Sequence, residues 1–398
     1  MRLLDGVTVL DLTQAYSGPF AAMHLADHGA NVIKFERPPG GDQTRSWGPF
    51  KNGASAYYAL INRNKRGVTV DLTSEDGKNV FREMVKKADV VVENFRVGTM
   101  EKLGLGYEEL QKINPKIIYA SISGFGLNGP LAKRPAYDIV AQCMSGITSV
   151  TGFKEMGPTK IGPSMGDSYT GSYLTMGIAM ALYNREKTGQ GHRLEVAMMD
   201  VLYHNLENAV VEYTVGGVTP GQVGNVDPAI APFDIFEGKD GQFALGVGTN
   251  KMWGEVCEAM GRMDLHQDPR YLNNIDRVNN YFGPGMLRET LLEWTKTKTV
   301  QEMEDIMVPA GIPFAPVLDV AQATEHPQTK ARNMIQEVDD PVMGKIRICG
   351  IPIKVKGISD EIARPAPQLG QHNVEVLKEV LGYDDKKVEE LKQKKVIF

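Results

Sequence analysis

The first 125 residues alternate between short β-branched runs and segments with a helical pattern of apolar residues. This order is typical of βαβ units, in which parallel strands form one sheet and the intervening helices cover its faces. The pattern predicts strands over residues 7–12, 31–36, 68–72, 89–94 and 116–123. We therefore expect the chain to begin with a Rossmann-like, doubly wound α/β domain.

Residues that favour helix ends mark the helices between these strands. Pro19 suits the first turn of a helix, and Gly29 suits the C-terminal cap of the same helix. Thr73 and Ser74 are potential N-caps of a second helix. A further helix is predicted over residues 107–113. The helices thus alternate with the predicted strands, as a parallel sheet requires.

A second region begins where glycine and proline become frequent, in the run GGVTPGQVGNVDPAIAP from Gly216. Such a run indicates a linker or a long functional loop. Strands are predicted on both sides of Lys239-Asp240-Gly241, which is a hairpin signal. Helical patterns then follow from Asn250 and over residues 285–295 and 300–308. This region predicts a second, smaller α/β domain.

Composition excludes several classes of protein. Hydrophobic residues make up 42% of the chain and charged residues 23%, which is the balance of a chain with a large core. The net charge of −5 argues against a surface that coats nucleic acid. Cys143, Cys257 and Cys349 lack the spacing of a disulfide framework or a metal site. Asp5 and Asp11 interrupt any signal peptide, and no run of 18 apolar residues occurs. We expect a cytoplasmic protein without a metal, membrane or nucleic-acid partner.

Two short motifs match known site patterns. Residues 124–129 match GxGxxG, but Pro130 and Pro135 interrupt the helix that must open on a dinucleotide-binding loop. Residues 162–166 match GxSxG, the nucleophile elbow of α/β-hydrolases, with Ser164 as the nucleophile. The preceding run KEMGPTKI lacks the buried strand that an elbow needs. A serine hydrolase that uses Ser164 stays open as an alternative.

Asp167 lies directly before the helical segment SYTGSYLTMGIAMALYNREKTG. Its mixture of small and bulky residues predicts a helix that packs closely on several sides. A carboxylate at a helix N-terminus is stabilised in its ionised form by the exposed amides and the macrodipole. Such an aspartate is either an N-cap or a preorganised nucleophile for covalent catalysis, and the residues alone leave both open.

Polar residues also gather where the predicted strands end. The basic ones are Lys34, Arg37, Arg45, Arg63, Lys65 and Arg66. Open α/β sheets bind ligands at this edge, so these residues are either a solvated surface or a site for a phosphorylated ligand. Asn94, Phe95 and Arg96 end another strand and offer an amide, an aromatic ring and a guanidinium on which a purine can stack.

Six ordered blocks of the sequence resemble the class III coenzyme A transferases, the family of formyl-CoA:oxalate and crotonobetainyl-CoA:carnitine transferases. The blocks are VLDLTQAYSGPFAAMHLADHGANVIKFERPPGGDQTR from Val9, NRNKRGVTVDL from Asn62, the stretch ADVVVENFRVG from Ala88 onward, RPAYDIVAQCMSG from Arg134, GDSYTG around Asp167, and ALYNREKTGQGHRLEVAMMD ending at Asp200. The block GDQTRSWGPF is similar to one in the acetyl-CoA:oxalate transferases. The resemblance spans nearly the whole chain.

The resemblance implies a ping-pong transfer of CoA from an acyl-CoA donor to a small carboxylic acid. Asp167 would carry the covalent intermediate, an aspartyl-CoA thioester, and backbone amides near Asp167 would stabilise the developing oxyanions. CoA thioester is then a substrate, and no tightly bound cofactor is expected. Besides the hydrolase, one alternative stays open, a CoA-binding protein that kept the fold and lost the reaction.

The resemblance also implies the residues of the site. Those expected to bind CoA are Gln14, Ala15, Arg37, Leu72, Asn94, Phe95 and Lys102. Those expected in the substrate pocket are Tyr16, Tyr137, Asp138, Gly224 and Asn225. Formyl-CoA transferases have Gln where this chain has Tyr16, and a tetraglycine flap where it has residues 224–228. The acceptor pocket and its lid are therefore expected to differ from theirs.

The family's architecture implies an interlocked homodimer in which each chain threads its partner. Combined with the sequence pattern, it gives the expected boundaries. These are a large CoA-binding domain over residues 1–200, a linker over 201–224, a small domain over 225–318, and a C-terminal segment over 319–398 that returns to the large domain.

Overall fold

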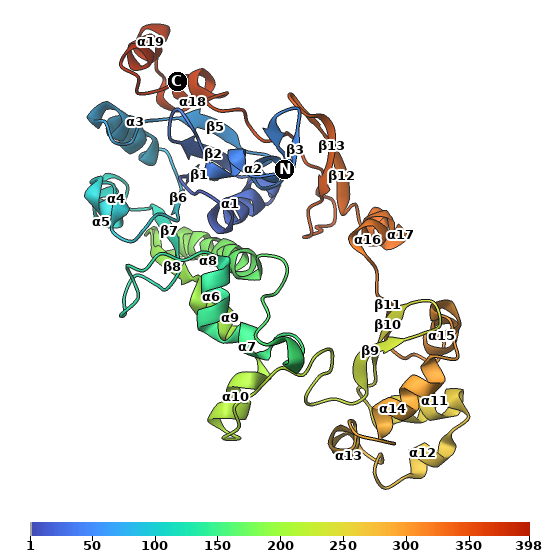
Figure 1. Cartoon of the computed structure of the whole chain (residues 1–398). Helices are drawn as coiled ribbons and strands as arrows, with labels where there is room; N and C mark the ends of the chain where they lie inside the picture. The colour runs from blue at the N-terminus through green and yellow to red at the C-terminus, as the bar shows by residue number, and fades with distance from the viewer. Residues whose placement is uncertain (1) are drawn as a thin grey trace. The chain divides into compact units, whose positions relative to one another are not determined.

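The computed structural model describes residues 2–398, which form two compact units (Figure 1). Unit 1 comprises the residues up to Ile147 together with Lys160–Val210 and Pro327–Phe398. Unit 2 comprises Thr148–Thr159 and Val211–His326. The segment expected as a linker, 201–224, begins inside helix α9 (Met198–His204) and contains helix α10 (Asn208–Thr214). The short segment 148–159 in unit 2 has no counterpart among the expected boundaries.

Unit 1 is built on a parallel sheet of six strands. They are β1 (Thr8–Asp11), β2 (Asn31–Glu36), β5 (Arg66–Thr69), β6 (Val90–Glu93), β7 (Ile118–Ser123) and β8 (Arg193–Ala197). Their order across the sheet is β5-β2-β1-β6-β7-β8, and every pair is parallel. The chain first builds the sheet outward from β1 on one side and then returns to its other side with β6. This is the strand order of the Rossmann fold, and the predicted parallel α/β sheet is confirmed.

The central strands are apolar because both of their faces are buried. Residues that alternate along a strand point to opposite faces of the sheet. In β1, Leu10 packs into one core cluster and Val9 into another. In β6, Val91 likewise belongs to the first cluster and Val90 to the second. A continuous β-branched run therefore marks a central parallel strand, with about 1.5–3 kcal/mol from each fully buried side chain.

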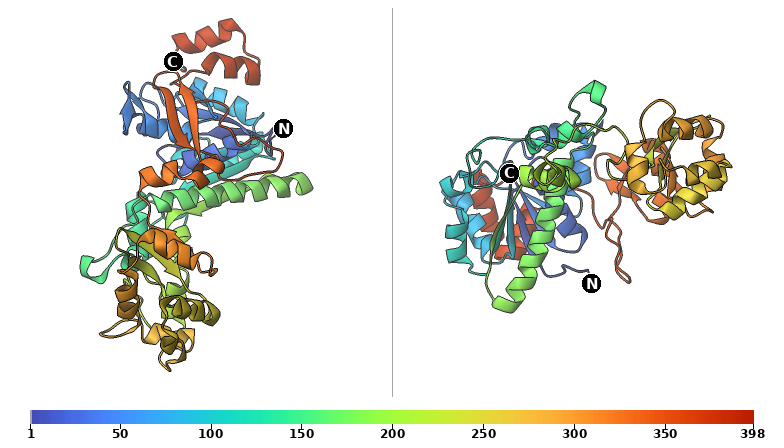
Figure 2. Two further views of the ribbon diagram at one scale, coloured as in Figure 1. Left: turned by 90° about the vertical axis from the view of Figure 1, so that its right-hand side faces the viewer. Right: turned by 90° about the horizontal axis from the view of Figure 1, so that it is seen from below.

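Helices cover both faces of this sheet. One face carries α1 (Ser17–Asp27) and the 24-residue helix α8 (Met165–Thr188), which pack against each other. The other face carries α3 (Glu75–Val85), α5 (Tyr107–Ile113), α18 (Asn373–Leu381) and α19 (Asp385–Gln393). Figures 1 and 2 show the red C-terminal helices and the green α8 on opposite sides of the sheet. The C-terminal segment therefore completes the core of unit 1.

The predicted helix ends are largely present. Helix α5 has the predicted bounds, and Ser74 caps α3 by accepting a hydrogen bond from the Gly77 amide. Strand β5 begins two residues and ends three residues earlier than predicted, and Leu72 follows the strand and packs beside the core instead of continuing the sheet. In residues 2–398, none of the helices has the length and apolar character that a membrane span requires.

Shorter elements complete unit 1. The helices are α2 (Ala56–Asn62), α4 (Thr99–Lys102), α6 (Asp138–Ser145), α9 and α17 (Pro327–Ala331). Two hairpins pair β3 (Phe50–Lys51) with β4 (Ala54–Ser55) and β12 (Ile335–Asp340) with β13 (Gly344–Cys349). A 3-10 helix, η1, covers Gln43–Ser46 after β2. Helix α7 (Ile147–Val150) spans the change from unit 1 to unit 2.

Unit 2 contains an antiparallel sheet of order β11-β10-β9 with helices around it. Its strands are β9 (Phe233–Glu237), β10 (Gln242–Gly246) and β11 (Phe314–Pro316), and the first two form the predicted hairpin. Its helices include α11 (Asn250–Met260), α12 (Met263–Gln267), α13 (Asn274–Asn279), α14 (Leu287–Thr295), α15 (Val300–Met307) and α16 (Val320–Glu325), and η2 is the 3-10 helix Lys154–Met156. Helix α10, like α7, spans the change from one unit to the other. The core of unit 2 forms around Phe236, Phe243 and Trp253, which are fully buried.

Candidate active site

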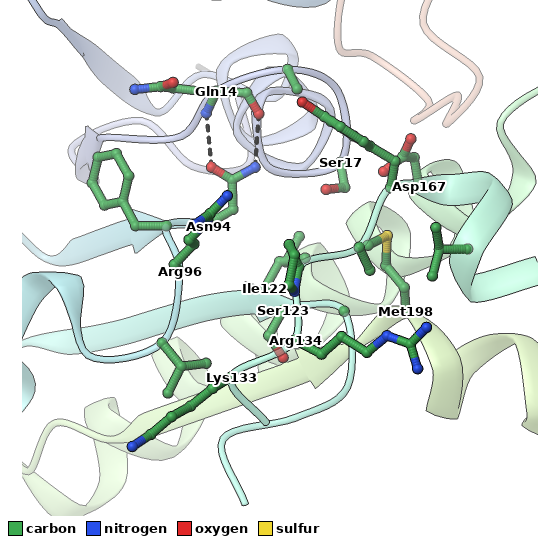
Figure 3. Close-up of a pocket in the computed structure, with 18 of the residues that line it drawn as sticks. Gln14, Ser17, Asn94, Arg96, Ile122, Ser123, Lys133, Arg134, Asp167 and Met198 are labelled. Atoms are coloured by element: carbon green, nitrogen blue, oxygen red, sulfur yellow. Dashed lines mark hydrogen bonds between the residues drawn. The ribbon is translucent and has the colours of Figure 1, made fainter. Parts of the chain in front are cut away.

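A cavity of about 580 Å³ lies where β1 and β6 end, at the point where the strand order of the sheet reverses (Figure 3). Ligands of open α/β sheets bind in the crevice outside this point, because the loops after the two strands diverge there. The loops after β1, β6 and β7 line the cavity, as do residues 132–137, Asp167 and Met198. The sheet topology alone thus selects this cavity as the candidate site.

Two of the lining loops are held together by a pair of amides. The Gln14 backbone amide donates to Asn94 Oδ1 at 2.8 Å, and Asn94 Nδ2 donates to the Gln14 carbonyl at 2.7 Å. Figure 3 shows this reciprocal pair across the gap between the two loops. Gln14, Ala15, Asn94 and Phe95, all expected to bind CoA, line the same cavity. The structure therefore brings these four residues together.

Asp167 lies in the first turn of α8 and provides the carboxylate among the described residues that line the cavity. Burial raises the pKa of Asp167 to about 7, and the nearby carboxylate of Asp138 contributes in the same direction. A hydrogen bond from Ser17 opposes this shift only in part, and Figure 3 shows Ser17 beside Asp167. The prediction of a carboxylate held ionised by its helix is therefore wrong, because desolvation and a like charge outweigh the helix terminus.

Asp138 explains why the start of α8 has little effect on Asp167. Asp138 Oδ1 accepts hydrogen bonds from the amides of Gly166 at 2.8 Å and of Asp167 at 3.4 Å. Its other oxygen accepts from Gln142 Nε2 at 2.7 Å, within helix α6. These amides are the ones expected to stabilise oxyanions, and Asp138 already occupies them. Asp138 is a buried cap of α8 and does not itself line the cavity.

Two glycines allow close packing around the start of α1. A Cβ atom on Gly171 would lie 2.7 Å from the Ser17 carbonyl oxygen, so only glycine allows α8 to approach α1 here. A Cβ atom on Gly18 would lie 2.5 Å from the Cβ atom of Thr13. Within residues 2–398, the amides of Ser17 and Gly18 have no hydrogen-bond acceptor, and Tyr16 provides no side-chain cap for α1. Helix α1 thus presents unpaired amides beside Asp167.

Two tyrosines lie near Asp167 and Ser168. The Tyr16 hydroxyl is 3.4 Å from Ser168 Oγ, and its ring stacks on Phe20 with centroids 5.3 Å apart. The ring of Tyr57 lies 5.7 Å from that of Tyr16. Burial raises the pKa of both tyrosines, and the carboxylate of Asp167 contributes to the shift, so both hydroxyls stay protonated near it. Tyr16 therefore lies beside Asp167, outside the cavity lining.

Most of the basic residues at the strand ends are not available to a ligand. Lys34 pairs with Asp42, Lys65 with Asp11, Arg63 with Asp27, Arg45 with Glu36, and Arg66 with Glu375 and Glu379. The predicted phosphate site at these residues is therefore wrong. A buried charge needs a counter-ion, and for Arg63, Lys65 and Arg66 acidic residues of other segments provide it.

Other cations face the cavity instead. Arg96 follows β6, and Lys133 and Arg134 belong to the loop that leads into α6; all three are exposed and line the cavity. Figure 3 shows Lys133 and Arg134 on the side opposite Asp167 and Ser17. Sequence reasoning singled out Arg96 but missed Lys133 and Arg134. The available signal was their position after the glycine-rich loop, at the start of the block that contains Tyr137.

The remaining residues implied by the resemblance lie in different places. Tyr137 lines the cavity and is exposed. Arg37 and Lys102 are exposed and Leu72 is half-buried, and these three lie outside the cavity lining. Gly224 and Asn225 belong to unit 2, where Gly224 has a left-handed φ of 73° and packs against Phe153, and Asn225 is exposed. The roles of all these residues remain predictions.

Ser164 lacks the surroundings of a nucleophile elbow. It precedes the first residue of α8, and the residues before it, 157–163, form turns and extended segments without a strand. An elbow depends on a buried strand that leads directly into the serine. The GxSxG match is therefore a helix start and not an elbow.

The model of the protein family described as CoA-transferase family III matches residues 4–373. The chain belongs to this family. It is 41% identical over 377 residues to the acetyl-CoA:oxalate CoA-transferase of Acetobacter aceti, which covers 94% of this chain and 95% of that one. It is 35% identical to the human succinyl-CoA:glutarate CoA-transferase, over 98% of this chain and 89% of that one.

Solved structures agree with this assignment. The crystal structure of a CAIB/BAIF family protein from Brucella suis is 35% identical, with a TM-score of 0.82 over 95% of this chain and 99% of that one. The class III CoA-transferase is therefore an enzyme with a mixed α/β fold and a parallel central sheet. Members of its family transfer CoA between acids and use CoA thioesters as substrates.

Proposed function

We propose that this CoA-transferase moves CoA from an acyl-CoA donor to a small carboxylic acid by a ping-pong reaction through an aspartyl-CoA thioester on Asp167. One observation carries the proposal. Asp167 is the carboxylate at the cavity that the sheet topology selects, and no Lys or Arg within residues 2–398 forms an ion pair with it. A partly desolvated carboxylate without a counter-ion is a stronger nucleophile than a paired one.

The reaction consists of exchanges at carbonyl carbons. An oxygen of ionised Asp167 attacks the thioester carbonyl of the donor, the C–S bond breaks, and CoA leaves as a thiolate, so that a mixed anhydride forms. The thiolate then attacks the Asp167 carbonyl carbon, the anhydride C–O bond breaks, and the donor acid leaves as a carboxylate. The acceptor carboxylate repeats these steps in reverse and leaves as the new acyl-CoA. No group is oxidised or reduced, and no net proton is transferred.

The tetrahedral oxyanions of these steps need hydrogen-bond donors. The amides of Gly166 and Asp167 are occupied by Asp138, whereas those of Ser17 and Gly18 have no acceptor within residues 2–398. Helix α1 packs closely on α8 at Gly171, so its first turn lies next to Asp167. The first turn of α1 is therefore the proposed oxyanion site.

The cations at the cavity suit a phosphorylated substrate. Arg96, Lys133 and Arg134 are exposed and unpaired within residues 2–398, unlike the buried cations beneath the cavity. CoA carries a diphosphate and a further phosphate group, which Arg and Lys bind through charge-assisted hydrogen bonds. We assign the part of the cavity beside Asp167 to the reactive end of CoA, and we propose that Gln14, Ala15, Asn94 and Phe95 hold the CoA molecule. The remaining CoA-binding predictions are Arg37, Leu72 and Lys102, which extend the binding surface beyond the cavity.

The acceptor belongs to the class of small carboxylic acids. The two named relatives are described as acting on oxalate and on glutarate. We propose that Tyr16, Tyr137 and Asp138 shape the acceptor pocket, where hydroxyl groups and aromatic rings would limit the size of the acid. Gly224 and Asn225 are the proposed lid, which would exclude water from the intermediates.

We propose the interlocked homodimer as the active form. Exposed apolar side chains follow one side of α8, including Met176, Met180 and Tyr183. Such a face is usual for a surface that a second copy covers. Light scattering after gel filtration measures the mass of the assembly, and a monomer that transfers CoA at the full rate would contradict the dimer.

The central test is to trap the covalent intermediate. The pure enzyme is incubated with acetyl-, formyl- or succinyl-CoA without an acceptor, treated with hydroxylamine, digested and analysed by mass spectrometry. We expect a hydroxamate on Asp167 with at least one donor, because hydroxylamine attacks the Asp167 carbonyl of the aspartyl-CoA thioester and releases CoA as the thiol.

Two variants serve as controls. Asp167→Ala removes the nucleophile and must give no hydroxamate. Asp138→Asn keeps an oxygen at the cap of α8 and must still give the adduct on Asp167. CoA binding without an adduct from any of the three donors would support the non-catalytic alternative, and an adduct on Ser164 would support the hydrolase.

A further inference from the structure

The loop Thr13–Ala15, between β1 and α1, is held by side chains from other segments. The Thr13 amide donates to Asp11 Oδ1 at 2.9 Å, and the Thr13 carbonyl accepts from Lys34 Nζ at 2.9 Å. Asn94 binds both backbone groups of Gln14, as described above. The Ala15 amide donates to Asp42 Oδ1 at 3.3 Å. Five of the six backbone polar groups of this loop are thus bound by side chains.

Ala15 has an unusual backbone conformation. Its φ is 65°, in the left-handed region that residues with a Cβ atom seldom adopt. Such a conformation persists where the surroundings determine it, and it concentrates at functional sites. Ala15 lines the cavity, and α1 begins two residues later at Ser17. The conformation of Ala15 therefore sets the direction in which the chain enters α1.

Asp42 connects this residue with a second loop of the cavity. Its Oδ1 also accepts from the amide and hydroxyl of Thr44, at 2.9 and 2.8 Å, and so caps the 3-10 helix η1. Gln43, at the start of η1, lines the cavity. Asp42 Oδ2 lies 2.9 Å from Lys34 Nζ, and both side chains are fully buried. One carboxylate thus joins two lining loops and a buried cation.

The charge state of Asp42 suits this position. Burial alone would raise the pKa of Asp42, but Lys34 and the hydrogen bonds from Thr44 outweigh it and hold the pKa below its ordinary value. Lys34 also donates to the Thr13 carbonyl, so the same ion pair binds the loop at both ends. The Thr13 end of the loop has little room to move, because Gly18 packs against Thr13 without space for a Cβ atom.

We propose that Asp42, paired with Lys34, is a positioning residue for CoA transfer: it holds Ala15 in the left-handed conformation and thereby places the first turn of α1 against Asp167. The proposal rests on the proposed function of Asp167. Asp42 does not touch the reacting atoms. It acts through Ala15 on Ser17, which lies beside Asp167 (Figure 3), and on the unpaired amides of the first turn of α1.

The test compares Asp42→Asn with Asp27→Asn. Asp27 is an equally buried carboxylate in an ion pair, with Arg63 Nη2 at 2.8 Å, and it contacts no residue of the cavity lining. We expect both variants to lower Tm, because each leaves a buried cation with a neutral partner. Asp42→Asn is also expected to lower kcat about tenfold, the factor that an unsupported left-handed alanine costs, with a smaller change in KM. Asp27→Asn is expected to keep the wild-type kcat.

A change at Ala15 separates positioning from folding. Glycine adopts a left-handed φ without a steric penalty, so adding Ala15→Gly to Asp42→Asn is expected to restore kcat by about threefold or more. Should Asp42→Asn fail to fold, Ala15→Val in the otherwise unchanged enzyme tests the same step, since a β-branched residue strongly resists this φ. We expect about a tenfold or greater loss of kcat for Ala15→Val. A wild-type kcat in Asp42→Asn or Ala15→Val, or no restoration by Ala15→Gly, would overturn the proposal.

The readout distinguishes this proposal from that for Asp167. The rate at which the Asp167 adduct forms is measured in a single turnover, first in the wild-type enzyme. An enzyme that transfers CoA without an adduct on Asp167 contradicts the proposed mechanism and with it the positioning role. A wild-type adduct that forms equally fast in Asp42→Asn contradicts only the role of Asp42.

Discussion

Unit 1 contains two kinds of buried carboxylate, and their surroundings give them opposite properties. Asp11 and Asp42 lie beneath the cavity, each with a lysine Nζ at 2.9 Å. Burial would raise the pKa of Asp11, but Lys65 and Lys34 lower it below its ordinary value, as Lys34 does for Asp42. Within residues 2–398, no lysine or arginine forms an ion pair with Asp167, and burial with Asp138 nearby raises its pKa to about 7. Burial alone therefore does not predict the charge of a carboxylate.

At this edge of the sheet, the paired carboxylates have a structural role, and the unpaired carboxylate of Asp167 has the proposed chemical role. Paired carboxylates hold loops, since an ion pair with filled hydrogen bonds has no free oxygen to attack a carbonyl carbon. A carboxylate without a cation is costly to bury and is retained where a reaction needs it. The five predictions below test this contrast, from the largest expected effect to the smallest.

Removal of the unpaired carboxylate has the largest expected effect. Asp167→Ala is expected to lower the transfer rate at least about a thousandfold, because the covalent route through the nucleophile is lost. Its Tm at pH 8 is expected to rise, since the ionised carboxylate is disfavoured in the folded protein. Steady-state transfer assays and thermal melts measure both. A lower Tm would mean that Asp167 also stabilises the fold.

Removal of a partner from a paired carboxylate should act on stability instead. Lys65→Met leaves Asp11 without its closest cation in a fully buried site. We expect the free energy of unfolding to fall by about 3–5 kcal/mol, measured by denaturant titration. The double variant Lys65→Met with Asp11→Asn, which removes both charges, should lose less. Equal losses in the single and double variants would contradict the pairing argument.

The close approach of α1 and α8 is tested by a single methyl group. Gly171→Ala places a Cβ atom 2.7 Å from the Ser17 carbonyl oxygen, so one helix must move away from the other. We expect kcat to fall about tenfold, the change that a small misplacement at the reacting groups produces. Gly177→Ala is the matched control on the same helix, because its Cβ atom would meet only the flexible end of Leu194 at 3.1 Å. Equal activity in the two variants would contradict the packing argument.

The pKa of Asp167 predicts how activity depends on pH. Only the ionised carboxylate attacks, so kcat/KM should rise as the pH increases through about 7. Asp138→Asn removes the like charge and should shift this rise to lower pH, with a rate at pH 6 a few times that of the wild type relative to the plateau. Ser17→Ala removes the opposing hydrogen bond and should shift the rise to higher pH. Shifts of the same sign would show that these two groups do not set the pKa.

Ser164 should matter least. Ser164→Ala is expected to change the transfer rate by less than about twofold, because Ser164 makes no cap hydrogen bond and lies outside the cavity lining. A fluorophosphonate probe followed by peptide mapping should leave Ser164 unlabelled. Stoichiometric labelling would mean that the GxSxG motif is reactive despite the missing strand.

The sequence by itself determined the local elements and the family. Apolar runs such as Val90–Val92 mark strands buried on both faces, and the Ser74 cap marks the start of α3. The hairpin at Lys239–Gly241 is equally local, since a turn and its flanking residues specify it. The resemblance to the family pointed to Asp167, because one of the six ordered blocks contains this residue. These local features depend on residues that are close together in the chain, so they can be predicted from the sequence.

The tertiary structure alone decided which charges act. From the sequence alone, Lys34 and Lys65 are as suitable for binding a phosphate as Lys133 and Arg134. In the structure, Lys34 and Lys65 form ion pairs with buried carboxylates, whereas Lys133 and Arg134 line the cavity. The pKa of Asp167 depends on Asp138, which lies 29 residues away in the chain and takes the amide that would otherwise lower it. Interaction between charges depends on distance and on the solvent removed from around them. Both are properties of packed segments, so no local pattern of residues encodes them.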